Sequence, residues 1–141
     1  MLTQSMTGLG GVGKTQIAVE YAYRNANKYQ LIWFFHAETS TTLKTDVDGF
    51  FKYVCQRDTS ALSLEDISML FKNWMDGNED WLFIFDNSED YDTLKAFLPR
   101  SNAGQGRVLI TSRNSYWDRV DRDPIDIMVF APDEALGFLR E

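Results

Sequence analysis

The chain has 141 residues, of which 44% are hydrophobic and 14% aromatic, and its formal net charge is −7. This composition suits one packed domain over residues 1–141, and no apolar run approaches the roughly 20 residues that cross a bilayer. The acidic balance excludes nucleic acid as a partner, because binding to phosphate backbones needs a dense basic surface. The single cysteine, Cys55, excludes an intrachain disulfide and is typical of a cytoplasmic protein.

The first third of the chain predicts a helix, a strand and a second helix. Glycine-rich Gly8 to Gly13 precedes Lys14 to Asn27, which holds helix-compatible residues and no proline or glycine. Leu31 to His36 is a short, almost wholly apolar run, typical of a strand buried on both faces of a parallel sheet. The next helix is predicted by apolar residues that share one helical face: Leu43, Val47, Phe50, Phe51 and Val54.

The middle of the chain predicts a capped helix followed by a second buried strand. Ser63 with Asp66 three residues later resembles an N-terminal capping signature. The apolar spacing that follows is helical, and Gly77 is a plausible stop. Trp81 to Phe85 is again wholly apolar, and it ends in Asp86.

The last third predicts shorter elements. Asp92 to Leu98 is a helical stretch stopped by Pro99, and a turn over residues 102–106 precedes a strand over Val108 to Thr111. A weaker strand over Ile125 to Phe130 leads to a helix that begins at Pro132. Strands that alternate with helices predict an α/β fold with a mainly parallel sheet.

A phosphate-binding loop is predicted at the start of the first helix. Gly8, Gly13, Lys14 and Thr15 meet the pattern G-x-x-x-x-G-K-[ST] in full. Glycine lets backbone N–H groups approach a phosphate closely, and the helix that follows directs further N–H groups and its positive dipole end at the same point. Lys14 supplies a mobile charge for the β- and γ-phosphates, and the Thr15 hydroxyl is a hard oxygen ligand suited to Mg²⁺. The alternative is an ordinary glycine-rich turn before a helix.

Candidate catalytic residues follow the second and third strands. Asp86 ends its strand where ligands bind in parallel sheets, and it is predicted to hold Mg²⁺ together with Thr15. Asn87 orients a water but cannot accept its proton, so slow or absent hydrolysis is expected. Glu89 or Asp90 could serve as the base in its place, and the alternative is that both are acidic residues of a loop. Arg113, just after the third strand, is predicted to reach a γ-phosphate with its guanidinium, and the alternative is a surface arginine. For His36 a structural role is favoured over a role in the site.

Together these motifs resemble the NB-ARC group of STAND-class P-loop NTPases, the switch modules of NLR-type receptors. The segment G-L-G-G-V-G-K-T-Q-I-A resembles the P-loop of this family, L-F-I-F-D-N its Walker B strand, and G-R-V-L-I-T-S-R its sensor strand, while Q-I-A-V-E-Y-A-Y-R is similar to fungal members. The resemblance implies a three-layer P-loop NTPase fold with about five strands, including a central strand before Gly8, and a bound ADP or ATP with Mg²⁺. It implies these nucleotide-binding residues: Gly8, Gly10, Gly11, Val12, Gly13, Lys14, Thr15 and Gln16.

The resemblance also implies an incomplete module. Because the chain ends before the small helical and winged-helix domains of the family, we expect it to belong to a longer receptor-like protein. Nucleotide binding by the isolated chain is expected to be weak, about tens of micromolar or poorer, and switching needs a domain that is absent here. Two alternatives stay open: a catalytic P-loop ATPase or small-molecule kinase, and a remnant that binds no nucleotide and serves as an interaction domain.

Overall fold

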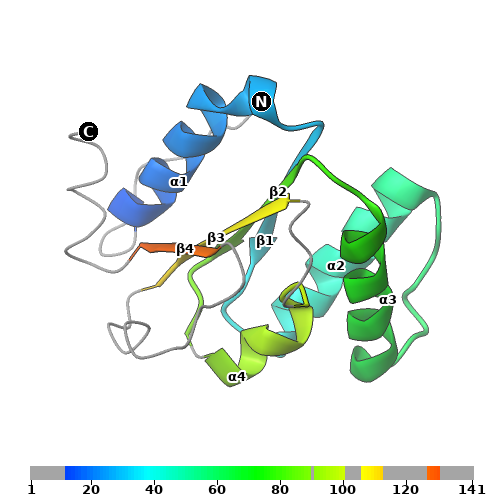
Figure 1. The fold of residues 1–141 in the computed structure, drawn as a ribbon. Coiled ribbons are helices and arrows are strands. Elements are labelled where there is room, and N and C mark those ends of the chain that lie inside the picture. The colour runs from blue at the N-terminus through cyan, green and yellow to red at the C-terminus, as the bar shows by residue number, and fades with distance from the viewer. Residues whose placement is uncertain (1–11, 90, 101–105, 113–126, 131–141) are drawn as a thin grey trace.

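A computed structural model describes residues 12–89, 91–100, 106–112 and 127–130 (Figure 1). The helices are α1 (Val12–Arg24), α2 (Ser40–Cys55), α3 (Leu64–Gly77) and α4 (Tyr91–Leu94), and two 3-10 turns are η1 (Ala26–Lys28) and η2 (Lys95–Phe97). The strands are β1 (Leu31–His36), β2 (Trp81–Asp86), β3 (Gly106–Thr111) and β4 (Ile127–Phe130). The predicted alternation of helices and strands is therefore confirmed.

Element boundaries differ from the sequence predictions mainly late in the chain. The helix predicted over residues 92–98 is one short turn of α-helix, α4, followed by the 3-10 turn η2. Of the strand predicted over residues 125–130, the described part is β4, and the helix predicted from Pro132 lies outside the described residues. Within the described part of the chain, no helix is long and apolar enough to span a bilayer.

All four strands of the sheet are parallel and pair in chain order, β1-β2-β3-β4. In this register Leu31 lies opposite Trp81 and His36 opposite Asp86. Ile110 likewise lies opposite Phe85, next to the carboxyl end of β2. Because the strands run the same way, the residues that follow β1, β2 and β3 meet at one edge of the sheet.

The predicted central strand before Gly8 does not fit this sheet. Residues 1–11 lie outside the described part, so a fifth strand stays a prediction. A central placement does not fit the described sheet, because every neighbouring pair of strands is hydrogen-bonded directly: β1 to β2, β2 to β3 and β3 to β4. The interior of the sheet is closed, and a further strand can join only at an outer edge.

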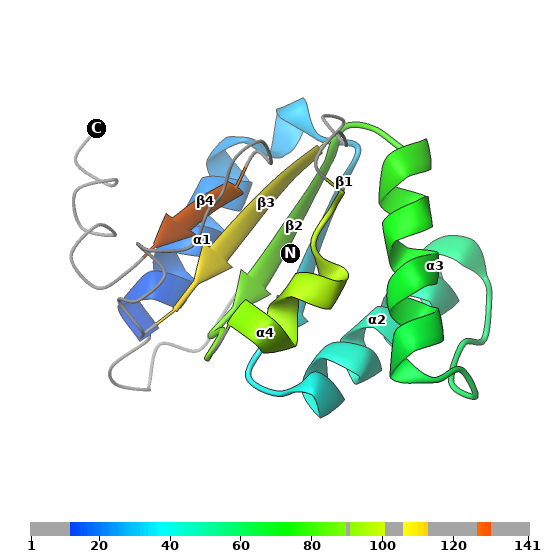
Figure 2. The ribbon, with the colours of Figure 1, turned by 60° about the horizontal axis from the view of Figure 1, so that its bottom comes forward.

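Strand residues alternate between two cores, one on each face of the sheet. On one face Leu82, Ile84 and Leu109 pack with Ile17 and Tyr21 of α1. On the other face the alternate residues of the same strands pack against α2, α3 and α4, and Figure 2 shows these helices on the side of the sheet away from α1. The result is a layered α/β structure in which α1 alone among the described helices covers the first face.

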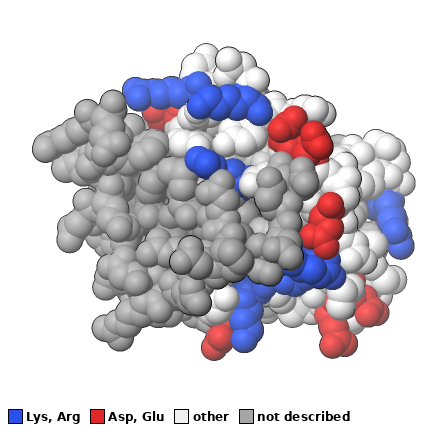
Figure 3. Space-filling view, in the orientation of Figure 1, with Lys and Arg blue, Asp and Glu red and all other residues white. Residues whose placement is uncertain are grey.

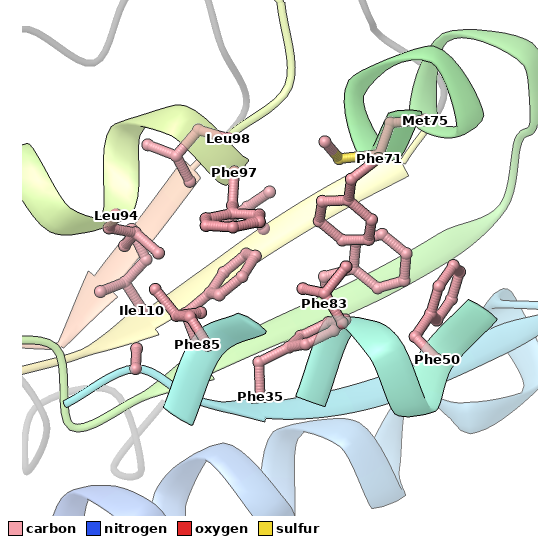
Figure 4. Packing of buried hydrophobic residues seen from close by; sticks show 14 of the residues in the cluster. Phe35, Phe50, Phe71, Met75, Phe83, Phe85, Leu94, Phe97, Leu98 and Ile110 are labelled. Carbon is pink, nitrogen blue, oxygen red and sulfur yellow. The ribbon is translucent and has the colours of Figure 1, made fainter. Parts of the chain in front are cut away.

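The second core is built largely from aromatic rings. Phe83 lies at its centre, with ring centroids 5.2 Å from Phe35, 5.3 Å from Phe50 and 5.2 Å from Phe71 (Figure 4). Most of these pairs are edge-to-face or offset, the arrangements that aromatic quadrupoles favour. This cluster fixes α2 and α3 against β1 and β2 and so supports the strand ends that form the candidate site.

Side-chain caps explain where α2 and α3 begin. Thr39 accepts a hydrogen bond from the backbone N–H of Thr42, and the Thr42 hydroxyl accepts one from the backbone N–H of Thr39, which together form a capping box. The predicted cap at Ser63 is confirmed, since its side chain accepts from the backbone N–H of Asp66.

On the surface visible in Figure 3, acidic and basic side chains of the described residues lie interspersed.

Gly106→Ala is expected to lower the free energy of unfolding by about 1–3 kcal/mol, the usual cost of overpacking a core. Gly106 lies opposite Trp81 in the sheet, and a Cβ added there would come within 2.1 Å of the Trp81 indole. That indole is buried and its N–H donates to the carbonyl of Asn78, so it has little room to move. Urea unfolding of both proteins measures the difference.

Gly49→Ala is the matched control for this substitution. Gly49 lies inside α2, and a Cβ added there would meet nothing within 4 Å. Alanine is the better helix former, so a gain of about 0.5–1 kcal/mol is expected. Equal effects of the two substitutions would contradict the assigned position of the Trp81 ring.

Candidate functional site

The N-terminus of α1 provides the first part of the site. The helix begins at Val12, so the backbone of Gly13, Lys14 and Thr15 lies in its first turn, and this turn holds no acidic side chain. The first N–H groups of a helix have no partner within the helix, and they carry the positive end of its dipole. The helix start is therefore suited to an anion, because the residues of its first turn supply no carboxylate that would neutralise the positive end of the dipole.

Asp86 provides the second part. Its two carboxylate oxygens each lie 3.0 Å from the hydroxyl oxygen of Thr15, although the two residues are 71 positions apart in the chain. This contact arises because β2 ends beneath the start of α1, on the face that α1 covers. The proximity of Thr15 and Asp86 that the sequence predicts is thus observed.

A third residue, Thr111, completes the cluster. Its hydroxyl donates to Asp86 Oδ1 over 2.6 Å and accepts from the backbone N–H of Asn87 over 2.8 Å. Its carbonyl accepts from the backbone N–H of Ser88 over 2.9 Å. Sequence analysis placed Thr111 at a strand end but gave it no role, because a hydroxyl contact across two strands depends on their register.

The chain turns sharply after Asp86. Asn87 has a φ of 61°, in the left-handed region that asparagine tolerates better than most residues. Ser112 at the end of β3 donates its hydroxyl to the carbonyl of Ser88 over 2.7 Å. Hydrogen bonds from the end of β3 therefore hold the backbone of residues 87 and 88 in this turn.

His36 has a different partner. Its ring Nδ1 lies 2.8 Å from Asp46 Oδ2, its backbone N–H donates to the same carboxylate oxygen, and 71% of its side chain is exposed. The contact joins the end of β1 to α2, which matches the structural interpretation of His36. Glu38 and Glu89 are exposed.

Several predicted site residues fall outside what the structure describes. Gly8, Gly10, Gly11, Asp90 and Arg113 lie in undescribed segments. For Val12, Gly13 and Lys14 the backbone is described in α1, and Gln16 is half-buried in the same helix. The described cluster therefore consists of the helix start with Thr15, Asp86, Asn87 and Thr111.

Two described groups with a shifted pKa lie away from this cluster: Lys72 in α3 and Asp58 between α2 and α3. Burial lowers the pKa of the Lys72 ammonium in α3, and nearby Arg100 adds to this lowering. The same ammonium donates to the carbonyl of Leu98 over 2.8 Å, so it ties α3 to the segment after η2. The backbone N–H and hydroxyl of Ser60 lower the pKa of Asp58. Neither group bears on the cluster around Asp86.

The oxygen atoms of the cluster fit a magnesium ion that brings other ligands with it. Carboxylate and hydroxyl oxygens are the hard donors that Mg²⁺ prefers, and Mg²⁺ commonly takes one or two protein ligands beside phosphates and water. Among the described residues, no group of three His, Cys, Asp or Glu side chains is arranged to hold a metal ion. In such a site Asp86 and Thr15 would be two protein ligands, and phosphates and water would supply the others.

Comparison with known proteins shows that the chain is similar to parts of two regulatory proteins and of an NLR-like protein. The chain is 30% identical to the regulatory protein AfsR of Streptomyces coelicolor in an alignment 147 positions long, which covers 100% of the chain and 14% of AfsR. It is 28% identical to AfsR of Streptomyces griseus over 96% of the chain and 14% of that protein. It is 29% identical to a nucleotide-binding leucine-rich repeat (NLR)-like protein of Hyaloscypha variabilis, over 78% of the chain and 13% of that protein.

These relatives are much longer than the chain, which aligns with a small part of each. No family model matches the sequence, and no solved structure matches it either. The chain is thus distantly similar to one segment of larger regulatory and NLR-like proteins.

Proposed function

We propose that the chain binds the phosphates of ADP or ATP with Mg²⁺ and serves as the nucleotide-binding part of a longer signalling regulator of the NB-ARC or STAND kind. The observation that carries this proposal is the contact between Thr15 at the start of α1 and Asp86 at the end of β2, at 3.0 Å to each carboxylate oxygen. Two sequence motifs 71 residues apart meet at the place where a magnesium nucleotide would need both.

The charges of the cluster support magnesium as a companion that strengthens nucleotide binding. The helix start favours an anion, but the Asp86 carboxylate beside it repels one. A divalent cation between carboxylate and phosphate converts this repulsion into attraction. Lys14, in the first turn of α1, would add a further positive charge toward the β- and γ-phosphates. Binding of nucleotide and metal should therefore be mutually dependent.

Slow or absent hydrolysis is part of the proposal. Both oxygens of Asp86 already accept hydrogen bonds from threonine hydroxyls, and the next residue is Asn87, whose amide cannot accept a proton as a carboxylate can. A steady turnover above about 1 s⁻¹, the low end for enzymes, would favour a catalytic ATPase instead. The signalling role is supported by the similarity to AfsR and to the NLR-like protein.

Thermal unfolding with ADP, ATP and GTP tests the proposal. A ligand that binds only the native state at 100 times its dissociation constant adds about 2.7 kcal/mol, which corresponds to roughly 5–10 °C for a domain of this size. We expect millimolar ADP or ATP with Mg²⁺ to raise the melting temperature of the unmodified chain by such an amount. Lys14→Ala should remove most of this shift, because it removes the mobile charge.

Lys28→Ala is the control, since Lys28 is an exposed lysine in η1, just beyond the other end of α1. It should leave the nucleotide-induced shift unchanged. If no nucleotide raises the melting temperature of the unmodified chain, the proposal is refuted, and the chain is a remnant that acts through other contacts.

A further inference from the structure

The Thr111 hydroxyl is buried, with 1% of the residue exposed, and it makes two hydrogen bonds at the cluster. We infer that Thr111 is a positioning residue that fixes the Asp86 carboxylate for the metal ion and thereby sets the magnesium dependence of nucleotide binding. This inference rests on the proposed function. Thr111 itself is not assigned as a ligand of either metal or nucleotide.

The direction of the hydrogen bonds follows from proton counting. A backbone N–H can only donate, so the N–H of Asn87 uses the Thr111 oxygen as an acceptor. The single hydroxyl proton of Thr111 is then directed at Asp86 Oδ1, over 2.6 Å. This distance is typical of a hydroxyl donating to an ionised carboxylate. Thr111 therefore holds the Asp86 carboxylate in one orientation.

The same residue also fixes the backbone that carries Asp86 into its turn. Thr111 accepts the N–H of Asn87 with its hydroxyl and the N–H of Ser88 with its carbonyl. Asn87 has a φ of 61°, a conformation that surrounding contacts must hold in place. The Thr111 side chain thus contacts both the Asp86 carboxylate and the first backbone N–H of the turn that follows it.

The consequence concerns metal affinity more than nucleotide affinity. Partners that orient a metal-ligating side chain typically change metal affinity about 10–100-fold when they are removed. The phosphate contacts of the helix start do not involve Thr111, so binding of nucleotide without metal should change little. The Mg²⁺ concentration that gives half of the metal-dependent shift in melting temperature is the quantity that should move.

The test compares Thr111→Val with Thr111→Ser, measuring the ADP-induced shift in melting temperature across a series of Mg²⁺ concentrations and in EDTA. Valine has the shape of threonine without its hydroxyl, and serine keeps the hydroxyl. We expect Thr111→Val to raise the half-saturating Mg²⁺ concentration at least about tenfold, with the shift in EDTA unchanged. Thr111→Ser should behave as the unmodified chain does.

A second readout needs no nucleotide. Without the hydroxyl, the backbone N–H of Asn87 loses its acceptor, so its hydrogen exchange should speed up in Thr111→Val and not in Thr111→Ser. If Thr111→Val does not fold, Thr111→Cys takes its place, because cysteine differs from serine by one atom and is a weak donor.

Thr59→Val is the matched control. Thr59 is equally buried, with 1% exposed, and its hydroxyl donates to Asp48 Oδ1 over 2.6 Å, in α2. It should leave the Mg²⁺ dependence unchanged. If the unmodified chain binds Mg²⁺ and ADP and Thr111→Val keeps the same Mg²⁺ dependence, the inference is overturned while the proposed function stands. If the unmodified chain shows no shift with ADP, both fall.

Discussion

Phe83→Ala is expected to lower the free energy of unfolding by about 3–5 kcal/mol, the usual loss for a buried phenylalanine. Phe83 has no exposed surface, and its ring is stacked on Trp81 with centroids 4.6 Å apart and on Phe71 at 5.2 Å. Alanine would leave a cavity among rings from β1, β2, α2 and α3 (Figure 4). Because small domains have a total stability of only about 5–15 kcal/mol, the variant should be close to unfolding.

Urea unfolding followed by tryptophan fluorescence measures this effect, since Trp81 and Trp74 both lie near the Phe83 ring. Tyr23→Ala is the control, because Tyr23 is an aromatic residue of α1 that is 69% exposed. It should change the stability by less than about 0.5 kcal/mol. A loss below about 1 kcal/mol for Phe83→Ala would mean that the ring is not at the centre of the core.

Asp86→Asn is expected to abolish the part of ADP binding that depends on Mg²⁺. The substitution keeps the size of the side chain but removes its charge, and it replaces one acceptor oxygen with a donor amide that faces the hydroxyls of Thr15 and Thr111. It also removes the carboxylate that repels phosphate at the helix start. Binding of ADP in EDTA should therefore be kept or increased, and added Mg²⁺ should no longer strengthen it.

Calorimetric titration with ADP, with and without Mg²⁺, measures the two contributions. Each tenfold change in affinity corresponds to about 1.4 kcal/mol. Asp48→Asn is the matched control, since Asp48 also accepts a buried threonine hydroxyl, from Thr59, but lies in α2. A full response to Mg²⁺ in Asp86→Asn would show that the ion is held elsewhere, and it would remove the main support for the proposed site.

Local patterns in the sequence were sufficient to predict most elements and one half of the site. Strands were readable at residues 31–36 and 81–86 because apolar runs of this length between turn signals have few other structures open to them. The second strand is buried as predicted, but the first lies at the edge of the described sheet, and of its residues only Phe35 is buried. The cap at Ser63 was readable because capping chemistry involves residues only three positions apart. The pairing of Thr15 with Asp86 was predicted because a phosphate-loop motif and an acid at the carboxyl end of a parallel strand both mark the place where ligands bind in such sheets.

Only the tertiary structure decided contacts that depend on strand order and register. The direct pairing of β1 with β2, of β2 with β3 and of β3 with β4 closes the interior of the sheet, which leaves no central place for a strand before Gly8. The reach of the Thr111 hydroxyl to Asp86, the close approach of Gly106 to Trp81 and the pairing of His36 with Asp46 are likewise long-range contacts. Periodicity and capping are properties of neighbouring residues, whereas which distant segments touch is set by how the whole chain packs.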